Sequence, residues 1–380
     1  MKTIAIFIGG YLPAQKYGGP VSSIANLIDN LGDDYCFKII TTDHDLHETK
    51  RLSGISDGWN CVGKAEVLYL RDREVSYSVF KKVLLEIGAD LIYLNSFFSF
   101  RFIMPAICAA RNLDIPIILA TRGELSSKAL RMKAWKKTPY LHLLRMSGLL
   151  RDTVFQATSD EEFRNICERL NISSEKVHLL PNFPSASSFK QLIVKESGKL
   201  RALIVCRLVP NKNILYAINL IKQSKKEVTF DIYGPIENVE YWEQCKAAMA
   251  EAPSNVTITY KGALEPKNAQ SIYLSYDCLL FPTEFENYGQ VIAEALSHDC
   301  PVIISKGTTP WDDLAESGAG YIAKIGEDEA FVKAIDTIAN LDSEGYSSLV
   351  SRVRTYAQIK TDINRLRQGY LEMLSHAEKR

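Results

Sequence analysis

Residues 278–297 read CLLFPTEFENYGQVIAEALS, and this stretch decides the fold. It begins with the apolar run 278–281 and passes a loop that contains Pro282 and Gly289. It then continues with apolar residues at helical spacing, namely Val291, Ile292, Ala295 and Leu296. A short apolar strand followed by a Gly-containing loop and a helix is the unit from which parallel α/β sheets are built. The stretch therefore predicts one such unit.

Short apolar runs rich in Ile and Val recur along the whole chain, separated by helix-like stretches. Continuous rather than alternating hydrophobicity is typical of strands that are buried on both faces of a parallel sheet. The runs are 3–8, 37–41, 65–69, 91–94, 115–120, 153–156 and 177–180, then 202–206, 228–233, 256–260, 278–281, 301–305 and 320–323. We therefore predict an α/β fold of two Rossmann-like, doubly wound domains that face a cleft at the carboxyl ends of their strands.

The chain of 380 residues is long enough for two domains of ordinary size. The Ser- and Lys-rich segment 185–199 interrupts the pattern and is the predicted linker. We expect an N-terminal domain at 1–187 and a C-terminal domain at 188–355. Apolar residues at helical spacing continue over 343–377, and we expect the C-terminal helix 356–380 to pack back on the first domain.

The charge balance excludes a general attraction to nucleic acid, because 45 basic and 45 acidic residues cancel. The eight cysteines have no metal-site spacing and are interpreted as reduced core residues of a cytosolic protein. The apolar start of the chain is too short for a signal peptide, and the apolar window 91–110 is interrupted by polar residues. We therefore expect a cytoplasmic protein without a membrane-spanning segment.

Two glutamates flank the Gly-containing loop of the opening stretch. Glu286 lies in the loop and Glu294 in the helix, where carboxylates can accept hydrogen bonds from sugar hydroxyls. Backbone N–H groups around residues 287–290, at the start of the helix, suit a phosphate or hydroxyl. Taken alone, two such glutamates are more often solvated residues beside a helix.

Two cations follow the strand 202–206, and they make a functional role of the two glutamates the favoured interpretation. Arg207 and Lys212 lie on the loop between this strand and the next helix. Cations at the carboxyl end of a parallel strand can neutralise a diphosphate, and they lower the barrier where the diphosphate is a leaving group. The two segments together favour a site that binds a diphosphate beside hydroxyl groups.

The chain resembles the retaining family 4 glycosyltransferases of GT-B fold, whose signature is Glu, seven residues, Glu, preceded by a G-R-L-x-x-x-K loop. Glu286-Asn-Tyr-Gly289 and Glu294-Ala295 match the first motif, and Arg207-Leu208 with Lys212 match the second, with Cys206 in place of the usual Gly. Further matches extend over nearly the whole chain, at Tyr17-Gly18-Gly19-Pro20, Leu180-Pro181-Asn182, Tyr233-Gly234 and Cys300-Pro301-Val302-Ile303.

The resemblance implies a nucleotide-sugar donor bound by the second domain, an acceptor bound by the first, retention of anomeric configuration, and neither metal nor cofactor. It implies that Arg207 and Lys212 hold the diphosphate, Glu286 a donor-sugar hydroxyl and Glu294 the ribose hydroxyls. Asn287, Tyr288 and Gly289 would offer backbone N–H groups, and Gly234 belongs to the same donor site. Gly18 and Gly19 would let the backbone approach the reacting centre, with an ordinary turn as the alternative.

One position departs from the family pattern. Many relatives carry a His where this chain has Arg122, and Arg can bond phosphate but cannot titrate near neutrality. We count Arg122 with Arg207, Lys212 and Glu286 as the candidate catalytic residues. Glu124 and Asn95 are candidate acceptor contacts, although a plain loop is the alternative for Asn95.

The Asp43-His44-Asp45 sequence resembles the D-x-D metal motif of the other large glycosyltransferase fold. No partner carboxylates accompany it, so we interpret it as a solvated loop and expect no metal.

The segment 125–151 contains seven basic residues and no acidic residue. Apolar and aromatic residues lie between the charges, which suits an interfacial helix on anionic lipid headgroups. The candidate membrane-surface residues are Lys128, Arg131, Lys133, Trp135, Lys136 and Lys137. A solvated helix packed on the first domain is the alternative.

These features favour a retaining transferase that moves a sugar from a nucleoside-diphosphate sugar to a glycan or lipid-linked glycan acceptor in cell-surface polysaccharide synthesis. A UDP-sugar is the favoured donor and a GDP-sugar the second choice. We expect the protein at the inner face of the plasma membrane. A sugar-nucleotide epimerase or a non-catalytic accessory subunit of the same fold are the alternatives, whereas a phosphorylase would need a longer chain and a pyridoxal-phosphate lysine.

Overall fold

The computed structural model describes residues 1–14, 16–185, 189–190, 194–264 and 271–379. The chain forms two compact units: Met1–Phe183 together with Ile363–Arg380, and Pro184–Asp362. These divisions differ from the expected ones at 187/188 and 355/356. Phe183 still belongs to the first core, where its ring stacks on Tyr370 at 4.7 Å. The last helix of the second unit runs to Lys360.

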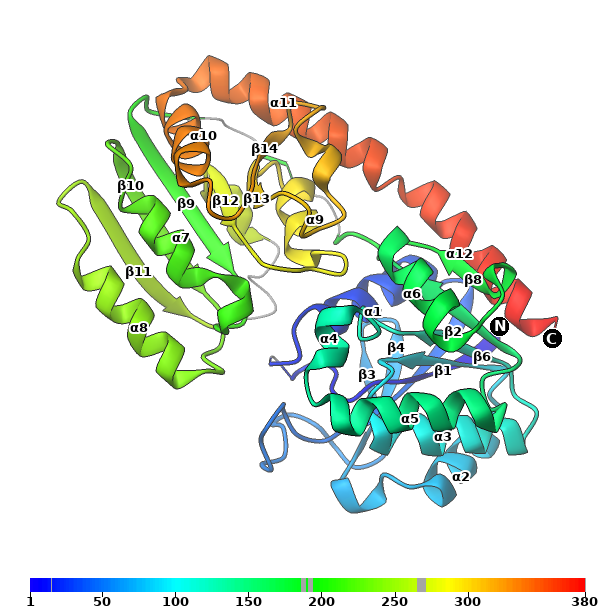
Figure 1. Cartoon of the computed structure of the whole chain (residues 1–380). Helices are drawn as coiled ribbons and strands as arrows, with labels where there is room; N and C mark the ends of the chain where they lie inside the picture. The colour runs from blue at the N-terminus through cyan, green and yellow to red at the C-terminus, as the bar shows by residue number, and fades with distance from the viewer. Residues whose placement is uncertain (15, 186–188, 191–193, 265–270, 380) are drawn as a thin grey trace. The chain divides into compact units, whose positions relative to one another are not determined.

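The first unit is an eight-stranded sheet with helices on both faces (Figure 1). Its strands are β1 (Lys2–Phe7), β2 (Tyr35–Thr42), β3 (Trp59–Val62), β4 (Ala65–Leu70), β5 (Leu91–Asn95), β6 (Ile117–Ala120), β7 (Thr153–Ala157) and β8 (Val177–Leu179). Its α-helices are α1 (Gly19–Leu31), α2 (Tyr77–Ile87), α3 (Phe100–Asn112), α4 (Ser127–Arg131), α5 (Ala134–Ser147), α6 (Asp160–Leu170) and α12 (Ile363–Glu378). The 3₁₀ helices η1 (Asp72–Glu74) and η2 (Ser174–Lys176) complete it.

The strand order is β3-β4-β2-β1-β5-β6-β7-β8, and every neighbouring pair except β3 with β4 is parallel. Side chains of β1 alternate between two cores: Ile4 and Ile6 pack with α1 and α12, and Ala5 and Phe7 with α2 and α3. This burial on both faces explains the continuous hydrophobicity of the strand. The antiparallel edge strand β3 was not predicted, because its residues are at most half-buried and form no apolar run.

The second unit is a six-stranded sheet in which all neighbouring strands are parallel. Its strands are β9 (Lys199–Val205), β10 (Glu227–Tyr233), β11 (Val256–Gly262), β12 (Cys278–Phe281), β13 (Val302–Ser305) and β14 (Gly320–Ala323). Its α-helices are α7 (Ile214–Ile221), α8 (Val239–Ala250), α9 (Gln290–Ser297), α10 (Asp328–Asn340) and α11 (Ser343–Lys360). The 3₁₀ helices are η3 (Pro210–Lys212), η4 (Ser271–Ser275) and η5 (Asp312–Leu314).

The strand order β11-β10-β9-β12-β13-β14 fixes where the unit can bind a ligand. The chain winds from β9 outward to β11 and then returns to the other side of β9 with β12. The loops that leave β9 and β12 therefore diverge to opposite faces of the sheet. Such a topological switch point is where open α/β sheets bind their ligands.

The C-terminal tail is two helices rather than one, because α11 ends at Lys360, with Thr361 as its C-cap residue, and α12 begins at Ile363. The hydroxyl of Tyr370 on α12 donates to the carbonyl of Pro181 at 3.1 Å, and Arg367 pairs with Asp34 at 2.6 Å. The tail thus returns to the first unit, where Leu366, Tyr370 and Met373 join the core.

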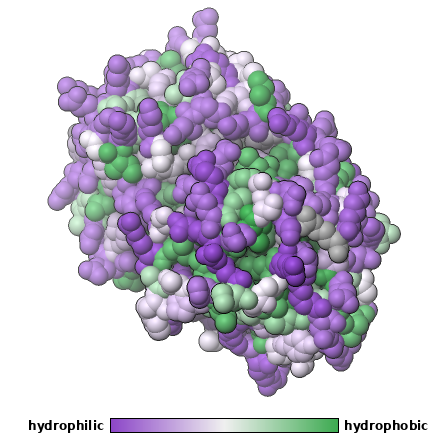
Figure 2. Space-filling model, turned by 45° about the vertical axis from the view of Figure 1, so that its right-hand side comes forward, coloured by the Kyte–Doolittle hydropathy of each residue, from purple (hydrophilic) through white to green (hydrophobic). Residues whose placement is uncertain are grey.

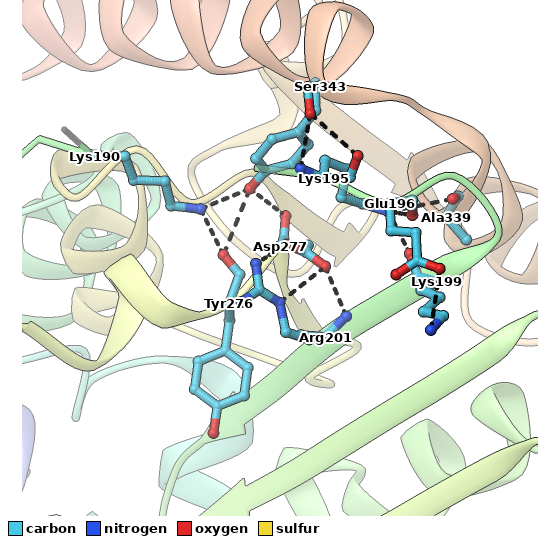
Figure 3. Close-up of polar contacts among 10 residues, drawn as sticks. Lys190, Lys195, Glu196, Lys199, Arg201, Tyr276, Asp277, Ala339 and Ser343 are labelled. Atoms are coloured by element: carbon cyan, nitrogen blue, oxygen red, sulfur yellow. Dashed lines mark hydrogen bonds and ion pairs between the residues drawn. The ribbon is translucent and has the colours of Figure 1, made fainter. Parts of the chain in front are cut away.

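The predicted linker 185–199 lies partly outside the described residues, and its described part is bound to the second unit (Figure 3). The Lys190 ammonium donates to the carbonyl of Tyr276 at 2.6 Å and to the hydroxyl of Tyr346 at 2.7 Å. The buried Lys195 ammonium donates to three backbone carbonyls, those of Glu196, Lys199 and Ala339. Burial lowers the pKa of both lysines. The segment therefore belongs to the second unit.

Hydrophilic side chains cover most of the face shown in Figure 2, with hydrophobic ones in separate patches.

The cysteines are all free, but only Cys245, Cys278 and Cys300 are buried and Cys61 is exposed, so the prediction of core residues holds for part of the set. Among the residues described, no helix combines the length and apolar character needed to cross a membrane.

Candidate functional site

The switch point of the second unit brings Lys212 and Glu286 into contact. Lys212 ends η3, which follows β9, and Glu286 lies on the loop that follows β12. The Lys212 ammonium forms an ion pair with the Glu286 carboxylate, and the two side chains are only 13% and 16% exposed. Residues 74 positions apart in the sequence thus form one mostly buried charged pair at the carboxyl end of the sheet.

Backbone hydrogen bonds hold the two loops in this arrangement. The N–H of Glu284 donates to the carbonyl of Asn211 at 3.1 Å, and the N–H of Glu286 donates to that of Thr308 at 2.7 Å. The Thr283 hydroxyl lies 3.4 Å from a Glu286 carboxylate oxygen. The ion pair therefore lies on loops that hydrogen bonds hold in place, and such loops favour a fixed geometry for a ligand.

Arg207, the second predicted cation, is paired with a residue that the sequence did not single out. Its Nη1 lies 3.0 Å from one carboxylate oxygen of Glu237 and 3.3 Å from the other. Arg207 is 42% exposed and Glu237 17%. Glu237 lies on the loop after β10, and β10 is the strand beside β9. Its place shortly after Gly234 is the signal in the sequence that could have pointed to Glu237.

Gly234 has a packing reason to be glycine. Its φ is +139°, and a Cβ at this position would lie 1.7 Å from the carbonyl oxygen of Cys206. The loops after β9 and β10 are thus in backbone contact, and no larger residue fits between them. Gly234 thus fixes the approach of these two loops, and this packing alone explains the glycine.

The Gly-containing loop runs into helix α9 as the sequence predicts. Gly289 is the N-cap residue with φ +78°, a conformation that favours glycine. The buried Tyr288 accepts a hydrogen bond from the indole of Trp311 at 2.5 Å through its backbone carbonyl, and Asn287 is half-buried beside it. One side of the loop 287–289 is therefore fixed by packing in the core of the unit.

Glu294 lies inside α9 and is half-buried. The hydroxyl of Tyr273 donates to its carboxylate at 3.1 Å. Burial raises the pKa of Glu294 to about 7, against the smaller opposing effect of the Tyr273 hydrogen bond. This carboxyl group can therefore change charge near neutral pH.

The glycines of the first unit lie where β1 leads into α1. Gly18 is the N-cap residue of α1 with φ +66°, and Gly19 is the first residue of the helix. Apart from Gly18 and its chain neighbours, no atom of the described residues lies within 4 Å of the place where a Gly18 Cβ would be. The conformation, rather than packing, therefore requires glycine.

The guanidinium of Arg122 forms hydrogen bonds with residues of its own unit. It donates to the side-chain oxygens of Asn95 and Asn182, the latter at 2.6 Å, and to the Tyr93 hydroxyl at 3.1 Å. Asn95 ends β5 and is 2% exposed, so its oxygen serves Arg122. The structure thus gives both residues an internal structural role in addition to the predicted ones.

Glu124 organises the loop after β5. Its carboxylate accepts from the N–H groups of Phe97 and Phe98, both at 2.6 Å, and from the Ser96 hydroxyl at 2.8 Å. Burial raises its pKa, and the donors partly oppose this. Oε2 accepts two of these bonds and Oε1 one, so the expected contact with an acceptor would add to Oε1.

Glu162 is a further buried carboxylate that the sequence did not single out. It accepts from the Thr121 hydroxyl and the Gly123 N–H, both at 2.6 Å, and is 2% exposed. Its signal was the Ser159-x-x-Glu162 spacing at a helix start, which is the pattern of a capping box.

The interpretation of 43–45 as a solvated loop was wrong. Asp43 and Asp45 are each 7% exposed, and Asp45 accepts from the N–H groups of Lys16 at 3.0 Å and Leu46 at 2.8 Å. The carboxylate is buried because it caps backbone donors of the neighbouring loop. Among the described residues, no group of three or more His, Cys, Asp or Glu side chains has the arrangement of a metal site.

The basic segment 125–151 forms two helices, α4 and α5, rather than one. They are separated at Met132 and Lys133, and Lys133 has φ +57°. The side chains of Met132, Trp135, Leu143 and Met146 are 63% to 76% exposed, with Lys128, Arg131, Lys133 and Lys136 exposed among them. We call these eight residues the α4–α5 surface.

Lys137 does not belong to that surface. Its ammonium donates to the carbonyl of Ala129 at 2.7 Å and lies 4.7 Å from the centre of the Phe98 ring. Tyr140 packs edge-on against Phe100, the first residue of α3, at 4.3 Å. These contacts fix α5 on the first unit, so part of the segment follows the alternative reading of a packed helix.

Comparison with known proteins finds similarity over the second unit. Residues 187–358 match the family model of glycosyl transferases group 1. An uncharacterized 41.2 kDa protein in the cps region of Klebsiella pneumoniae is 24% identical over 260 residues, which cover 65% of this chain and 69% of that protein. The human alpha-1,3/1,6-mannosyltransferase ALG2 is 22% identical over 145 residues, which cover 35% of each chain.

A solved structure matches the whole chain. The crystal structure of Anabaena Alr3699/HepE in complex with UDP-glucose has a TM-score of 0.70 at 16% identity, covering 99% of this chain and 100% of that one. At this identity the likeness shows the fold. Residues 187–358 thus match the model of the group 1 glycosyl transferases, and the two α/β units of the chain have the GT-B fold.

Proposed function

We propose that the protein is a retaining, metal-independent glycosyltransferase. It moves a sugar from a nucleoside-diphosphate sugar to a glycan or lipid-linked glycan acceptor in cell-surface polysaccharide synthesis. The observation that carries the proposal is the Lys212–Glu286 pair at the switch point of the second sheet, with Arg207 on the same β9 loop.

The chemistry follows from the charges. During transfer, the bond between the anomeric carbon and the diphosphate oxygen breaks while the acceptor hydroxyl oxygen bonds to that carbon, and the acceptor proton is released. Negative charge grows on the departing diphosphate, and Arg207 and Lys212 are fixed cations that stabilise it without a metal. Glu286 accepts from a hydroxyl of the donor sugar, and Glu294 accepts from the ribose hydroxyls.

The relatives support the choice of donor and product. The HepE structure holds UDP-glucose, and the mannosyltransferase forms alpha linkages by its name. We favour a UDP-sugar, with a GDP-sugar as the second choice. An alpha product would agree with retention, because the common nucleotide sugars carry the alpha configuration.

The α4–α5 surface supports an acceptor at a membrane. Its four cations have no acidic neighbour within 125–151, and its four exposed apolar side chains can enter the interface between headgroups and acyl chains. Each basic residue near an anionic leaflet adds about 1 kcal/mol of attraction. The protein would thus bind the inner face of the plasma membrane peripherally and meet a lipid-linked glycan there.

The donor assignment is tested with a panel of UDP- and GDP-sugars. We expect one donor to raise the melting temperature of the full chain and to be consumed in the presence of acceptor. Arg207→Ala should weaken that response, whereas Lys246→Ala, which removes a half-exposed cation on α8, should not. No response to any donor, or equal responses of both variants, would contradict the assignment. Conversion of a sugar nucleotide without acceptor would instead identify an epimerase.

The membrane assignment is tested with vesicles of phosphatidylglycerol and phosphatidylcholine. Replacing Lys128, Arg131, Lys133 and Lys136 by Gln should lower binding at least about ten-fold. The matched control replaces four exposed cations outside the α4–α5 surface, Lys50, Arg73, Lys82 and Arg164. Equal binding by both variants would refute a role for this surface.

A further inference from the structure

We propose that Glu237 is an internal competitor of the diphosphate: it occupies Arg207 when no nucleotide is bound and speeds the release of the nucleoside diphosphate product. The inference rests on the proposed function and adds to the donor site a residue that the motif does not contain. Glu237 would be a positioning residue, because it acts through Arg207.

The contact has the geometry of an exchangeable ion pair. A single guanidinium nitrogen, Nη1, lies 3.0 Å and 3.3 Å from the two oxygens of Glu237. The Arg207 side chain is 42% exposed, so an incoming anion can reach it from solvent. An ion pair with one partner so exposed contributes little to stability, so stability alone does not account for it.

The backbone holds Glu237 in place beside Arg207. The N–H of Leu208 donates to the carbonyl of Pro235 at 2.9 Å, and the N–H of Asn238 donates back to the carbonyl of Leu208 at 3.3 Å. Leu208 and Ile236 also form an isolated parallel bridge. Because the two loops are paired on both sides of Glu237, its carboxylate can leave Arg207 by side-chain rotation alone and return when the ligand departs.

The two ion pairs indicate which carboxylate a diphosphate would displace. The charges of Arg207 and Glu237 cancel, as do those of Lys212 and Glu286, so each cation already has a carboxylate partner. The Lys212 pair is mostly buried, and Glu286 is assigned to the donor sugar. Glu237 has no assigned ligand, and its partner is the more exposed cation. A diphosphate would therefore displace Glu237 first.

The competition should affect product more than substrate. A nucleoside diphosphate carries one more ionisable phosphate oxygen than its sugar ester, so it depends more on Arg207 and is repelled more by Glu237. Glu237 would thus favour exchange of product for new donor.

The test measures binding of UDP and UDP-glucose, or of the best nucleotide from the donor panel, to the full chain by calorimetry. Glu237→Gln should lower the Kd of the nucleoside diphosphate roughly five-fold, and that of the sugar nucleotide less, as expected on removing a competing surface ion pair. The inhibition constant of the product should fall by the same factor. Glu237→Asp, with a shorter reach, should give an intermediate value.

The matched control is Glu240→Gln, which removes an exposed charge on the first turn of α8, three positions away. It should leave both Kd values unchanged. If Glu237→Gln weakens binding, Glu237 orients Arg207 for the ligand and the competitor role is wrong. If it changes nothing, or if Glu240→Gln has the same effect, the proposal is overturned. A wild-type chain that binds no nucleotide at all would overturn the proposed function itself.

Discussion

Binding of the donor should strengthen about ten-fold as the pH rises from 6 to 8. Glu294 is assigned to the ribose hydroxyls, and burial raises its pKa to about 7. Only the ionised carboxylate accepts hydrogen bonds at both oxygens. With this pKa the ionised fraction is roughly 0.09 at pH 6 and roughly 0.91 at pH 8, which sets the ten-fold change.

Ionisation of Glu294 should lower the free energy of unfolding, although it strengthens donor binding. The folded state prefers the protonated carboxyl, because the pKa of Glu294 lies above its usual value of 4.5. The free energy of unfolding should therefore fall as the pH rises from about 4.5 through 7, by at most about 3 kcal/mol from this group. Tighter donor binding together with lower stability over one pH range distinguishes Glu294 from a group that is merely needed for folding.

The assay is a titration with the intact sugar nucleotide between pH 6 and 8. The nucleoside diphosphate is unsuitable, because its terminal phosphate titrates near pH 6. The Nδ1 of His298 contacts the backbone carbonyl of Glu294 at 2.8 Å, but burial lowers the pKa of His298 below its usual value. The shift of the His298 pKa is therefore opposite in direction to that of Glu294. Glu294→Gln should remove the pH dependence; if the variant keeps a ten-fold change, the reasoning is refuted.

Three further predictions concern single substitutions. Lys212→Ala should lower kcat about 10²- to 10³-fold in a donor turnover assay, since it removes a fixed cation from the leaving group and leaves Glu286 unpaired; a change under about three-fold would speak against this role. Gly234→Ala should destabilise the chain by more than about 2 kcal/mol in urea melts, because its Cβ would overlap the Cys206 carbonyl oxygen; a wild-type midpoint would show that the loop can shift. Lys195→Ala should cost about 2 kcal/mol, since three carbonyls each lose one donor, whereas Lys199→Ala, at a 47% exposed side chain, should cost less than about 0.5 kcal/mol.

The fold was predictable where burial on both faces left a continuous apolar run. Every predicted run corresponds to a strand, and the runs 278–281 and 320–323 match β12 and β14 to the residue. The edge strand β3 and the break at Thr361 were not predictable in this way. An edge strand needs no apolar run, and apolar spacing along α11 and α12 continues across the break although the two helices pack on different units.

The proximity of Lys212 and Glu286 was predictable, because both residues follow strands that become neighbours at the switch point. Their ion pair was not predicted, because it depends on the rotamers of the two side chains. The pairing of Arg207 with Glu237 was not predictable, because it depends on the register between the loops 206–208 and 234–238. That register follows from the close approach of Gly234 to Cys206, which leaves no periodic signal in the sequence.

The two units use polar residues at strand ends in different ways, and this limits inference from residue type. In the first unit, Glu124 after β6 accepts from backbone N–H groups of the loop after β5, and Asn95 at the end of β5 accepts from Arg122 after β6, so they hold the two loops together. In the second unit, Arg207 and Glu237 are partners that a stronger anion can separate. A carboxylate satisfied by backbone N–H groups has no gain from exchanging them, whereas an exposed ion pair loses little when a diphosphate replaces one member. Donor binding should therefore be sensitive to single charge changes, and substitutions at Glu124 should act first on the conformation of the loop.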